Sequence, residues 1–432
     1  MANDRQWGFR TRALHAGGQP DSATGARAVP IYQTTSFVFE DTTDAADLFA
    51  LQKYGTIYSR IANPTNAAFE ERIASLEGGI GAVATASGQA AEFLTITTLA
   101  GAGDHVVAAA SLYGGTYTLL ATTLARLGVE TTFVANTSVD GFAGAITDRT
   151  KLLYTEIIGN PTGAIADIEA LADVAHAHGL PLVVDATFAT PYLCRPMEFG
   201  ADIVLHSATK FLGGHGTSIA GVVSEAGHFD WTASGRFPRF TDPIPTYNNL
   251  RWHDNFGEYA FCTALRSEQL RDVGACLSPF NAFLLLQGIE TLPQRMEGHV
   301  ANAKAVAQWL DEDPRVSWVA YADRPNSPYH ELARKYLPLG PGAIFTFGLN
   351  GGRKAGQLFI ENLELVSHLA NVGDARTLVI HPASTTHQQM TDEQLEAAGV
   401  GPDMVRLSVG LEDLDDILYD LDQAMTAAQA VL

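Results

Sequence analysis

The sequence has few cysteines, few basic residues and no long apolar run. Its three cysteines, Cys194, Cys262 and Cys276, form no CxxC pair, which excludes a disulfide framework and a zinc knuckle. With 27 basic against 48 acidic residues, the net charge of −21 argues against nucleic acid or anionic membranes as partners. No apolar stretch approaches the roughly 20 residues that span a bilayer, and residues 1–12 lack an apolar signal region. We therefore expect a soluble, cytoplasmic protein.

Charged residues are scarce as well, at 17% of the chain against a usual value of about 25%, whereas hydrophobic residues make up 46%. This balance predicts a large interior or extensive subunit interfaces, and hence a homo-oligomer. A chain of 432 residues has room for two or three domains.

The chain divides into three segments. Residues 1–64 contain several glycines and prolines and little periodicity, which predicts an extended arm. A packed domain is expected over residues 65–279, beginning with a helix that Asn63 caps. Within it, residues 226–261 are rich in aromatic residues and proline, and we expect an inserted loop region there, either a lid or a contact with a neighbour. A long helical stretch opens a second, smaller domain over residues 280–432.

Short apolar runs alternate with helical stretches in the middle of the chain. Strand, helix, strand repeats with nearly continuous apolar strands predict an α/β fold, with a mostly parallel sheet covered by helices on both faces. Ligands of such sheets bind at the carboxyl ends of the strands. The expected strands cover residues 82–86, 105–110, 129–134, 151–157, 180–187, 202–208 and 221–224.

An acid and an amine follow two of these strands. Asp185 ends one apolar run, and Lys210 follows the next in an apolar, glycine-rich setting that a surface lysine does not need. Neighbouring strand ends present both groups to one pocket, where the lysine can act as a Schiff-base nucleophile. Taken singly, each residue has a commoner structural role, as a strand or turn cap.

A third feature makes the catalytic interpretation stronger. Ser87, Gly88 and Gln89 follow a strand and open a helix, where free amide groups and the helix dipole favour a phosphate. The chain has neither a Walker motif nor a G-x-G-x-x-G sequence, so a nucleotide is a poor candidate. Pyridoxal 5′-phosphate is the ligand that uses a phosphate cradle, a carboxylate and an amine together.

At this point the sequence resembles a known family. The segment DIVLHSATKFLGGHG at 202–216 matches the signature of the Cys/Met-metabolism family of PLP-dependent enzymes, and the resemblance extends from about Thr11 to the C-terminus. It implies the fold-type I architecture with an extended N-terminal arm and a smaller C-terminal α/β domain, and pyridoxal 5′-phosphate as cofactor.

The resemblance also implies a role for each matching residue. Lys210 would bind the cofactor covalently, Asp185 would pair with its pyridine nitrogen, and Tyr113 would stack on its ring, all three being catalytic. Arg406 would clamp the substrate carboxylate, with Asn371 and Tyr58 also in contact with the substrate. The other cofactor-binding residues would be Ser87, Gly88, Gln89, Asn160, Thr187, Ser207, Thr209, Tyr58 and Arg60.

Tyr58 and Arg60 would come from a neighbouring subunit, which gives the arm a purpose and predicts a tetramer built from dimers that share active sites. Simpler interpretations compete with some of these roles. Asn160 before Pro161 suits a turn, and Tyr113 suits a core. On alternation alone, Arg406 would point to water, although a guanidinium is the better group for a carboxylate.

No metal site is expected. His176 and His178 are two residues apart in a helical pattern and therefore lie on opposite faces. His381 and His387 bracket the segment HPASTTH and receive no metal either.

Within the family, the segment 369–387 and the insertion at 226–261 resemble the O-acetylhomoserine sulfhydrylase branch. Methionine γ-lyases carry a cysteine where this chain has Gly115. We therefore expect a γ-replacement that converts O-acetyl-L-homoserine and sulfide to L-homocysteine and acetate, in methionine biosynthesis. The alternatives are a cystathionine γ-synthase or γ-lyase, an O-succinylhomoserine sulfhydrylase, or an inactive PLP-fold binding protein. The sulfur donor, whether sulfide, another thiol or cysteine, stays open.

Overall fold

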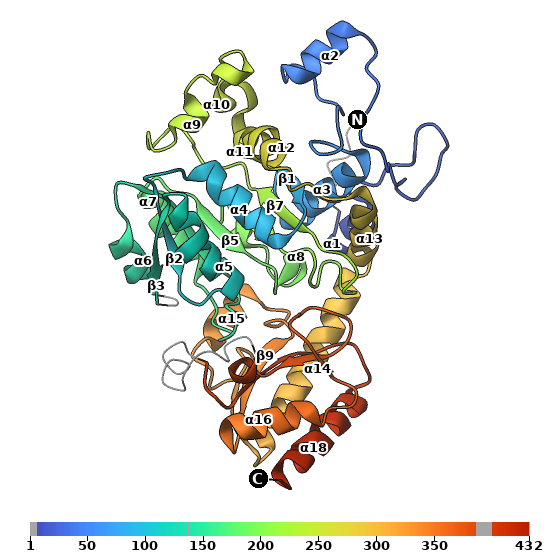
Figure 1. Cartoon of the computed structure of the whole chain (residues 1–432), viewed down its shortest axis with the longest axis vertical. Helices are drawn as coiled ribbons and strands as arrows, with labels where there is room; N and C mark the ends of the chain where they lie inside the picture. The colour runs from blue at the N-terminus through green and yellow to red at the C-terminus, as the bar shows by residue number, and fades with distance from the viewer. Residues whose placement is uncertain (1–6, 136–137, 386–399, 432) are drawn as a thin grey trace.

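Two sheets form the framework of the chain, and the computed structural model describes residues 7–135, 138–385 and 400–431. In Figure 1 the larger sheet lies in the upper half of the molecule and the smaller sheet in the lower half, near the C-terminus. None of the helices in these residues combines the length and apolar character that a membrane span requires.

The larger sheet has seven strands in the order β1-β7-β6-β5-β4-β2-β3. Strands β3, β2, β4, β5 and β6 run parallel, whereas β7 runs antiparallel to both β6 and β1. Every residue of β5 and β6 is buried, as expected for apolar strands covered on both faces. The predicted mostly parallel α/β sheet is confirmed. The strands are β1 (Gly81–Thr85), β2 (His105–Ala109), β3 (Glu130–Val134), β4 (Thr150–Glu156), β5 (Leu182–Asp185), β6 (Ile203–His206) and β7 (Gly221–Glu225).

Helices cover this sheet, and local sequence signals fix where they begin and end. At the start of α3, the Asn63 side chain accepts a hydrogen bond of 2.9 Å from the Thr65 N–H, and Gly78 ends the helix with a left-handed φ of 82°. Such a cap contributes about 1 kcal/mol. The main helices of this part are α3 (Pro64–Glu77), α4 (Gly88–Leu99), α5 (Gly114–Thr118), α6 (Val139–Ala145), α7 (Ile168–Ala177), α8 (Thr190–Leu193) and α13 (Pro279–Glu290).

The N-terminal arm is less irregular than the sequence predicts. It contains α1 (Phe9–His15), whose Ala13 is fully buried, and α2 (Thr42–Phe49), which Asp41 caps through the N–H groups of Thr43 and Asp44 at 2.8 Å. Helices of seven and eight residues are too short to show a clear apolar period, so the pattern missed them. In Figure 1, α2 stands at the top, apart from the sheets.

The insertion at 226–261 is also more ordered than expected. It forms the short helices α9 (Pro238–Thr241) and α10 (Trp252–Phe256) and leads into α11 (Ala260–Ala264). Trp231 is 2% exposed and packs on Phe240, with ring centroids 4.4 Å apart. Aromatic residues of this segment therefore pack on one another and form a small core within the same chain.

The smaller sheet has the strand order β10-β11-β12-β9-β8, and helices pack beside it. The long helix α14 leads from the upper to the lower part of the molecule in Figure 1. This agrees with a smaller C-terminal α/β domain; the boundaries at residues 64 and 279 stay predictions. The elements are β8 (Val316–Ala320), β9 (Ile344–Leu349), β10 (Ser367–His368), β11 (Leu378–Ile380), β12 (Met404–Ser408), α14 (Leu292–Glu312), α15 (His330–Tyr336), α16 (Gly352–Glu361) and α18 (Leu414–Gln429).

Candidate active site

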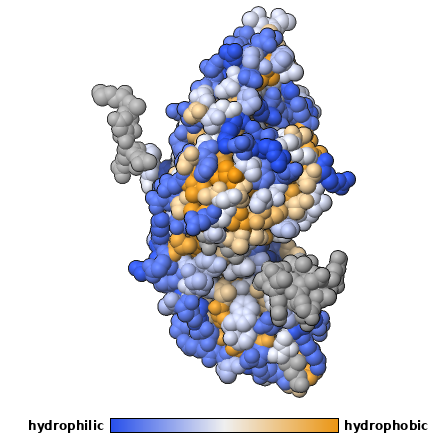
Figure 2. Space-filling model, turned by 90° about the vertical axis from the view of Figure 1, so that its left-hand side faces the viewer, coloured by the Kyte–Doolittle hydropathy of each residue, from blue (hydrophilic) through white to orange (hydrophobic). Residues whose placement is uncertain are grey.

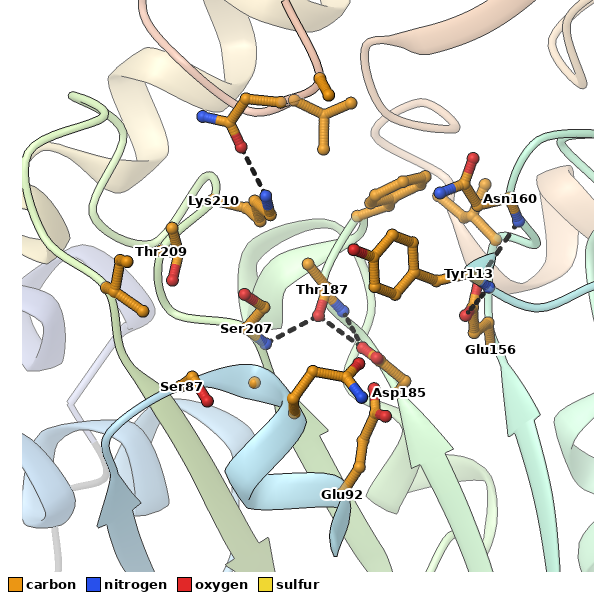
Figure 3. A pocket seen from close by; sticks show the side chains of 18 of the residues that line it. Ser87, Glu92, Tyr113, Glu156, Asn160, Asp185, Thr187, Ser207, Thr209 and Lys210 are labelled. Atoms are coloured by element: carbon orange, nitrogen blue, oxygen red, sulfur yellow. Dashed lines mark hydrogen bonds between the residues drawn. The ribbon is translucent and has the colours of Figure 1, made fainter. Parts of the chain in front are cut away.

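A cavity of about 260 Å³ lies at the carboxyl ends of β4, β5 and β6, where the parallel sheet predicts a ligand. All of the predicted site residues except Tyr58 and Arg60 line it. Figure 3 shows Ser87, Ser207 and Thr209 on one side, Asn160 and Glu156 on the other, and the Tyr113 ring between them. The lining residues among those predicted are Ser87, Gly88, Gln89, Tyr113, Asn160, Asp185, Thr187, Ser207, Thr209, Lys210, Asn371 and Arg406.

Asp185, the last residue of β5, is held by Thr187. The backbone N–H and the hydroxyl of Thr187 donate to Asp185 Oδ1, at 2.8 and 2.5 Å. The Thr187 hydroxyl oxygen in turn accepts from the Ser207 N–H at 2.8 Å. Burial raises the pKa of Asp185, while the Thr187 hydrogen bonds oppose that shift. The chain of contacts fixes the carboxylate and links the end of β5 to the segment after β6.

Lys210 lies in the turn after β6 and points into the cavity, where its Nζ donates to Asn371 Oδ1 at 2.5 Å. Burial, and then the charge of Arg406, lower its pKa to about 8. The turn is anchored from below by Arg295 of α14, whose guanidinium donates to the carbonyls of Phe211 and Leu212 at 2.7 and 3.2 Å. A lysine with this pKa is partly neutral near pH 8, as a nucleophile or base requires.

The N-terminus of α4 faces the same cavity. Ser87 caps the helix by accepting from the Ala90 N–H at 3.1 Å. Gly88 lies so close to Ser207 that a Cβ on it would be 2.6 Å from the Ser207 Cβ. Ser207 and Thr209 therefore stand beside the free N–H groups of a twelve-residue helix, a surface suited to an anion.

Arg406 of β12 reaches the cavity from the smaller sheet. Its Nη1 donates to Asn160 Oδ1 at 3.2 Å, and burial lowers its pKa to about 10. The alternation in this strand does place Arg406 opposite the buried Val405 and Leu407, but that face lines the cavity and not open solvent. A half-buried guanidinium at the edge of a cavity favours a carboxylate ligand.

Two acidic residues at this site were missed by the sequence analysis. Glu156, the last residue of β4, accepts from the Tyr113 N–H at 2.6 Å and from the Asn160 N–H at 3.2 Å. Glu92 of α4 accepts from the Thr116 hydroxyl at 2.9 Å. Burial raises the pKa of both glutamates well above the ordinary value. A signal did exist for Glu156, since it stands at the end of the expected strand 151–157, where ligands of parallel sheets bind. In the structure it pairs in register with Asp185.

Tyr58 and Arg60 lie outside this cavity in their own chain. They contact each other, with the Arg60 guanidinium 5.1 Å from the centre of the Tyr58 ring, and Tyr58 is 39% exposed. Their role in a neighbouring subunit stays a prediction.

Three of the four histidines that the sequence analysis considers as metal ligands lie within the described residues. His178 is exposed and bonds to the Val174 carbonyl, away from His176. Burial lowers the pKa of His381, whose ring bonds to Ser384 and to the Pro402 carbonyl at 2.5 and 2.9 Å. His387 lies outside the described residues.

The residues around this cavity fit pyridoxal 5′-phosphate. The amine of Lys210 and the carboxylate of Asp185 face one space, and the close approach at Gly88 opens the amide groups of α4 toward it. An amine for the aldehyde, an acid for the ring nitrogen and a helix N-terminus for the phosphate are the donor set that this cofactor needs.

Comparison with known proteins agrees with this arrangement. A family model described as Cys/Met metabolism PLP-dependent enzyme matches residues 10–426. The chain is 51% identical over 422 residues to a homocysteine synthase of Schizosaccharomyces pombe, covering 97% of this chain and 98% of that protein. It is also 51% identical over 419 residues to O-acetyl-L-homoserine sulfhydrylase 1 of Thermus thermophilus, covering 96% and 99%.

The fold has a close counterpart in a crystal structure from Campylobacter jejuni, described as a candidate O-acetylhomoserine (thiol)-lyase. The TM-score is 0.93 and the identity 36%, over 97% of this chain and 100% of that one. That structure carries N′-pyridoxyl-lysine-5′-monophosphate. With a family match over nearly its whole length, this chain belongs to the Cys/Met metabolism family of PLP-dependent enzymes and uses pyridoxal 5′-phosphate as its cofactor.

Proposed function

We propose that the enzyme is an O-acetyl-L-homoserine sulfhydrylase, which converts O-acetyl-L-homoserine and sulfide into L-homocysteine and acetate in methionine biosynthesis. The observation that carries the proposal is the single cavity that presents Lys210, Asp185 and Arg406 together. The names of the relatives from Schizosaccharomyces pombe and Thermus thermophilus support the same reaction.

Binding of the amino-acid substrate falls to Arg406 and its neighbours. Its guanidinium binds the α-carboxylate through two parallel hydrogen bonds, which a lysine cannot make. The bond to Asn160 Oδ1 holds the side chain in place, and Asn160 is itself fixed by Glu156. The α-carbon of the substrate is thereby turned toward Lys210.

The reaction removes protons from Cα and Cβ before acetate leaves Cγ, and both protons return after sulfide has added there. When bound, pyridoxal 5′-phosphate supplies the electron sink for the charge left on the substrate, and Asp185 holds the proton on its ring nitrogen. Lys210, whose pKa is about 8, takes the Cα proton in its neutral form. Tyr113 lies beside the same space and assists as a proton shuttle. Thr187 positions Asp185, and Ser87, Gly88, Gln89, Ser207 and Thr209 bind the phosphate.

The charge of the cavity favours the acetyl over the succinyl ester. Among the described residues that line it, only Lys210 and Arg406 carry a positive charge. Lys210 serves the cofactor and Arg406 the α-carboxylate, which leaves no cation for the second carboxylate of a succinyl group. Apolar residues, among them Phe188, Ile219 and Val372, offer a wall for an acetyl methyl group instead.

The assembly we propose is a homotetramer built from two dimers, in which Tyr58 and Arg60 complete the phosphate site of the neighbouring subunit. The arm exposes several large apolar side chains, which a neighbouring subunit would cover. Val38, Phe49 and Tyr54 are 100%, 61% and 85% exposed. Hydrophobic residues also gather midway along the face shown in Figure 2. We place the enzyme in the cytoplasm, in keeping with its three free cysteines.

The decisive assay measures acetate release from O-acetyl-L-homoserine with sulfide, and with cysteine or methanethiol as alternative acceptors. Parallel reactions replace the ester by O-succinyl-L-homoserine, and Lys210→Ala serves as the inactive control. We expect the highest kcat/KM for the acetyl ester with sulfide. Faster reaction with cysteine would identify a cystathionine synthase, and a colourless protein that stays inactive with added cofactor would identify a binding protein.

A further inference from the structure

Three possible metal ligands meet at the edge of the larger sheet that lies opposite the active site. His176 lies in the last turn of α7, Asp202 directly precedes β6, and His228 follows the end of β7. Because β6 and β7 are antiparallel, the start of β6 and the end of β7 lie side by side, at the end of the sheet opposite the cofactor site. Lys210 follows the other end of β6, so this cluster is separate from the cofactor site.

The three side chains already point at one another. Their ligand atoms lie within 4.8 Å, with His176 Nε2 at 2.9 Å from Asp202 Oδ2 and His228 Nε2 at 3.0 Å from Asp202 Oδ1. Asp202 is 2% exposed, and the Leu182 N–H donates to its Oδ2 at 2.8 Å, which fixes the carboxylate. Its buried Oδ1 makes no hydrogen bond of good geometry with the described residues, although His228 is near.

We propose that His176, Asp202 and His228 bind one divalent cation of the zinc class, with water as the fourth ligand. Two imidazole nitrogens and a carboxylate oxygen are a common set for Zn²⁺, which also admits Co²⁺ and Ni²⁺. With metal–ligand bonds of about 2.0–2.2 Å, neighbouring donors on a tetrahedral ion lie about 3.3–3.5 Å apart. The two histidine nitrogens face different oxygens of Asp202, and all the ligand atoms lie within 4.8 Å of one another, so the rings must turn by about 1 Å to reach that spacing around one ion.

The surroundings of the site support this assignment. The side chains of His176 and His228 are 37% and 46% exposed, so the rings have room to turn toward the ion and water can reach it. The buried Asp202 carboxylate also supplies negative charge, which attracts a cation.

Binding would join α7, the start of β6 and the first residues of the 226–261 insertion. A ligand that binds only the folded chain stabilises it, so the cation should raise the unfolding temperature. Because the cluster lies across the sheet from Lys210, turnover is expected to be unchanged.

The test is calorimetric titration of the holoenzyme with ZnCl₂. The protein carries no affinity tag, is first stripped of metal, and is kept in a buffer without added thiols. We expect one Zn²⁺ per chain with a dissociation constant in the micromolar range. His228→Gln and His176→Gln, both at exposed positions, should each weaken binding by at least about tenfold. His178→Gln is the matched control, because this exposed histidine on the same helix points elsewhere, and it should bind as the unmodified enzyme does.

Two further readouts separate a metal site from a hydrogen-bonded cluster. Zn²⁺ should raise the unfolding temperature of the unmodified enzyme and of His178→Gln, but not of His228→Gln. Co²⁺ should give the visible absorption of a tetrahedral site only where both histidines are present. The proposal is overturned if His228→Gln binds Zn²⁺ as tightly as the unmodified enzyme, or if no stoichiometric binding occurs in the micromolar range.

Discussion

Replacing Gly88 by alanine should weaken cofactor binding, whereas the same change at Gly114 should not. Both glycines are the first residue of a helix that begins beside the cavity, so alanine changes helix propensity equally at the two positions. A Cβ at Gly88 would lie 2.6 Å from the Ser207 Cβ and 3.0 Å from its Cα, while a Cβ at Gly114 would meet nothing within 4 Å. The two variants therefore differ in the clash alone.

The size of the effect follows from that contact. Carbon atoms pack at about 3.5–4.0 Å, so α4 and Ser207 must separate by about 1 Å to admit the methyl group. Overpacking of this kind typically costs about 1–3 kcal/mol. In the cofactor-free enzyme the two segments can move apart, but both must close on the phosphate when it binds. The cost then appears in binding, as an increase of about 5- to 150-fold in the Kd for pyridoxal 5′-phosphate.

The measurement is a titration of cofactor-free enzyme with pyridoxal 5′-phosphate, followed by the absorbance of the bound cofactor. Thermal unfolding of both variants without cofactor verifies that they fold. If Gly88→Ala binds the cofactor as tightly as Gly114→Ala does, then the contact between α4 and Ser207 does not shape the phosphate site, and that part of the argument is wrong.

Two further predictions concern the substrate clamp and stability in acid. Arg406→Lys keeps the charge but loses the paired hydrogen bonds to the carboxylate, so kcat/KM for O-acetyl-L-homoserine should fall by about 10- to 150-fold, at a cost of about 1.5–3 kcal/mol; an unchanged value would remove Arg406 from the substrate site. Burial lowers the pKa of His299 to about 4, from an ordinary value of 6.5. Between these two pH values the unfolded chain binds a proton at this histidine and the folded chain does not. The free energy of unfolding therefore decreases as the pH falls from 6.5 to about 4. His299→Asn, whose amide can replace the donor to the Val409 carbonyl, should flatten that dependence in urea unfolding; an equally steep loss would assign the acid sensitivity to other groups.

The strands of the larger sheet were predictable because their apolar runs are bounded by clear breaks. The expected strands at 151–157 and 202–208 correspond to Thr150–Glu156 and Ile203–His206. Burial on both faces demands continuous apolar sequence, and that demand is visible in the sequence itself. The helices of the arm and of the 226–261 insertion were not predictable, since three or four turns are needed before a helical period becomes distinct.

At the active site, prediction succeeded where a residue type stands at a strand end or in a family motif, as for Asp185 and Lys210, which the structure brings to one cavity. Prediction failed where a residue is surrounded by segments that are distant in the sequence. Nothing local shows that the polar face of β12 closes a cavity on the larger sheet, so Arg406 would be assigned to solvent by alternation alone. The grouping of His176 with Asp202 and His228 likewise depends on the antiparallel β7, which the sequence pattern does not specify.

The active site draws on both sheets, and the contributions differ in kind. Asp185 ends β5 of the larger sheet and Lys210 follows β6, whereas Arg406 lies on β12 of the smaller sheet and Asn371 lies between β10 and β11. The two parts meet at the Lys210–Asn371 and Arg406–Asn160 hydrogen bonds. The wall proposed for the acetyl group is shared in the same way, with Phe188 and Ile219 in the larger part of the chain and Val372 in the smaller part. The size of the cavity therefore depends on how the two parts are spaced. A small shift of one part against the other would change which ester fits without changing the reacting groups.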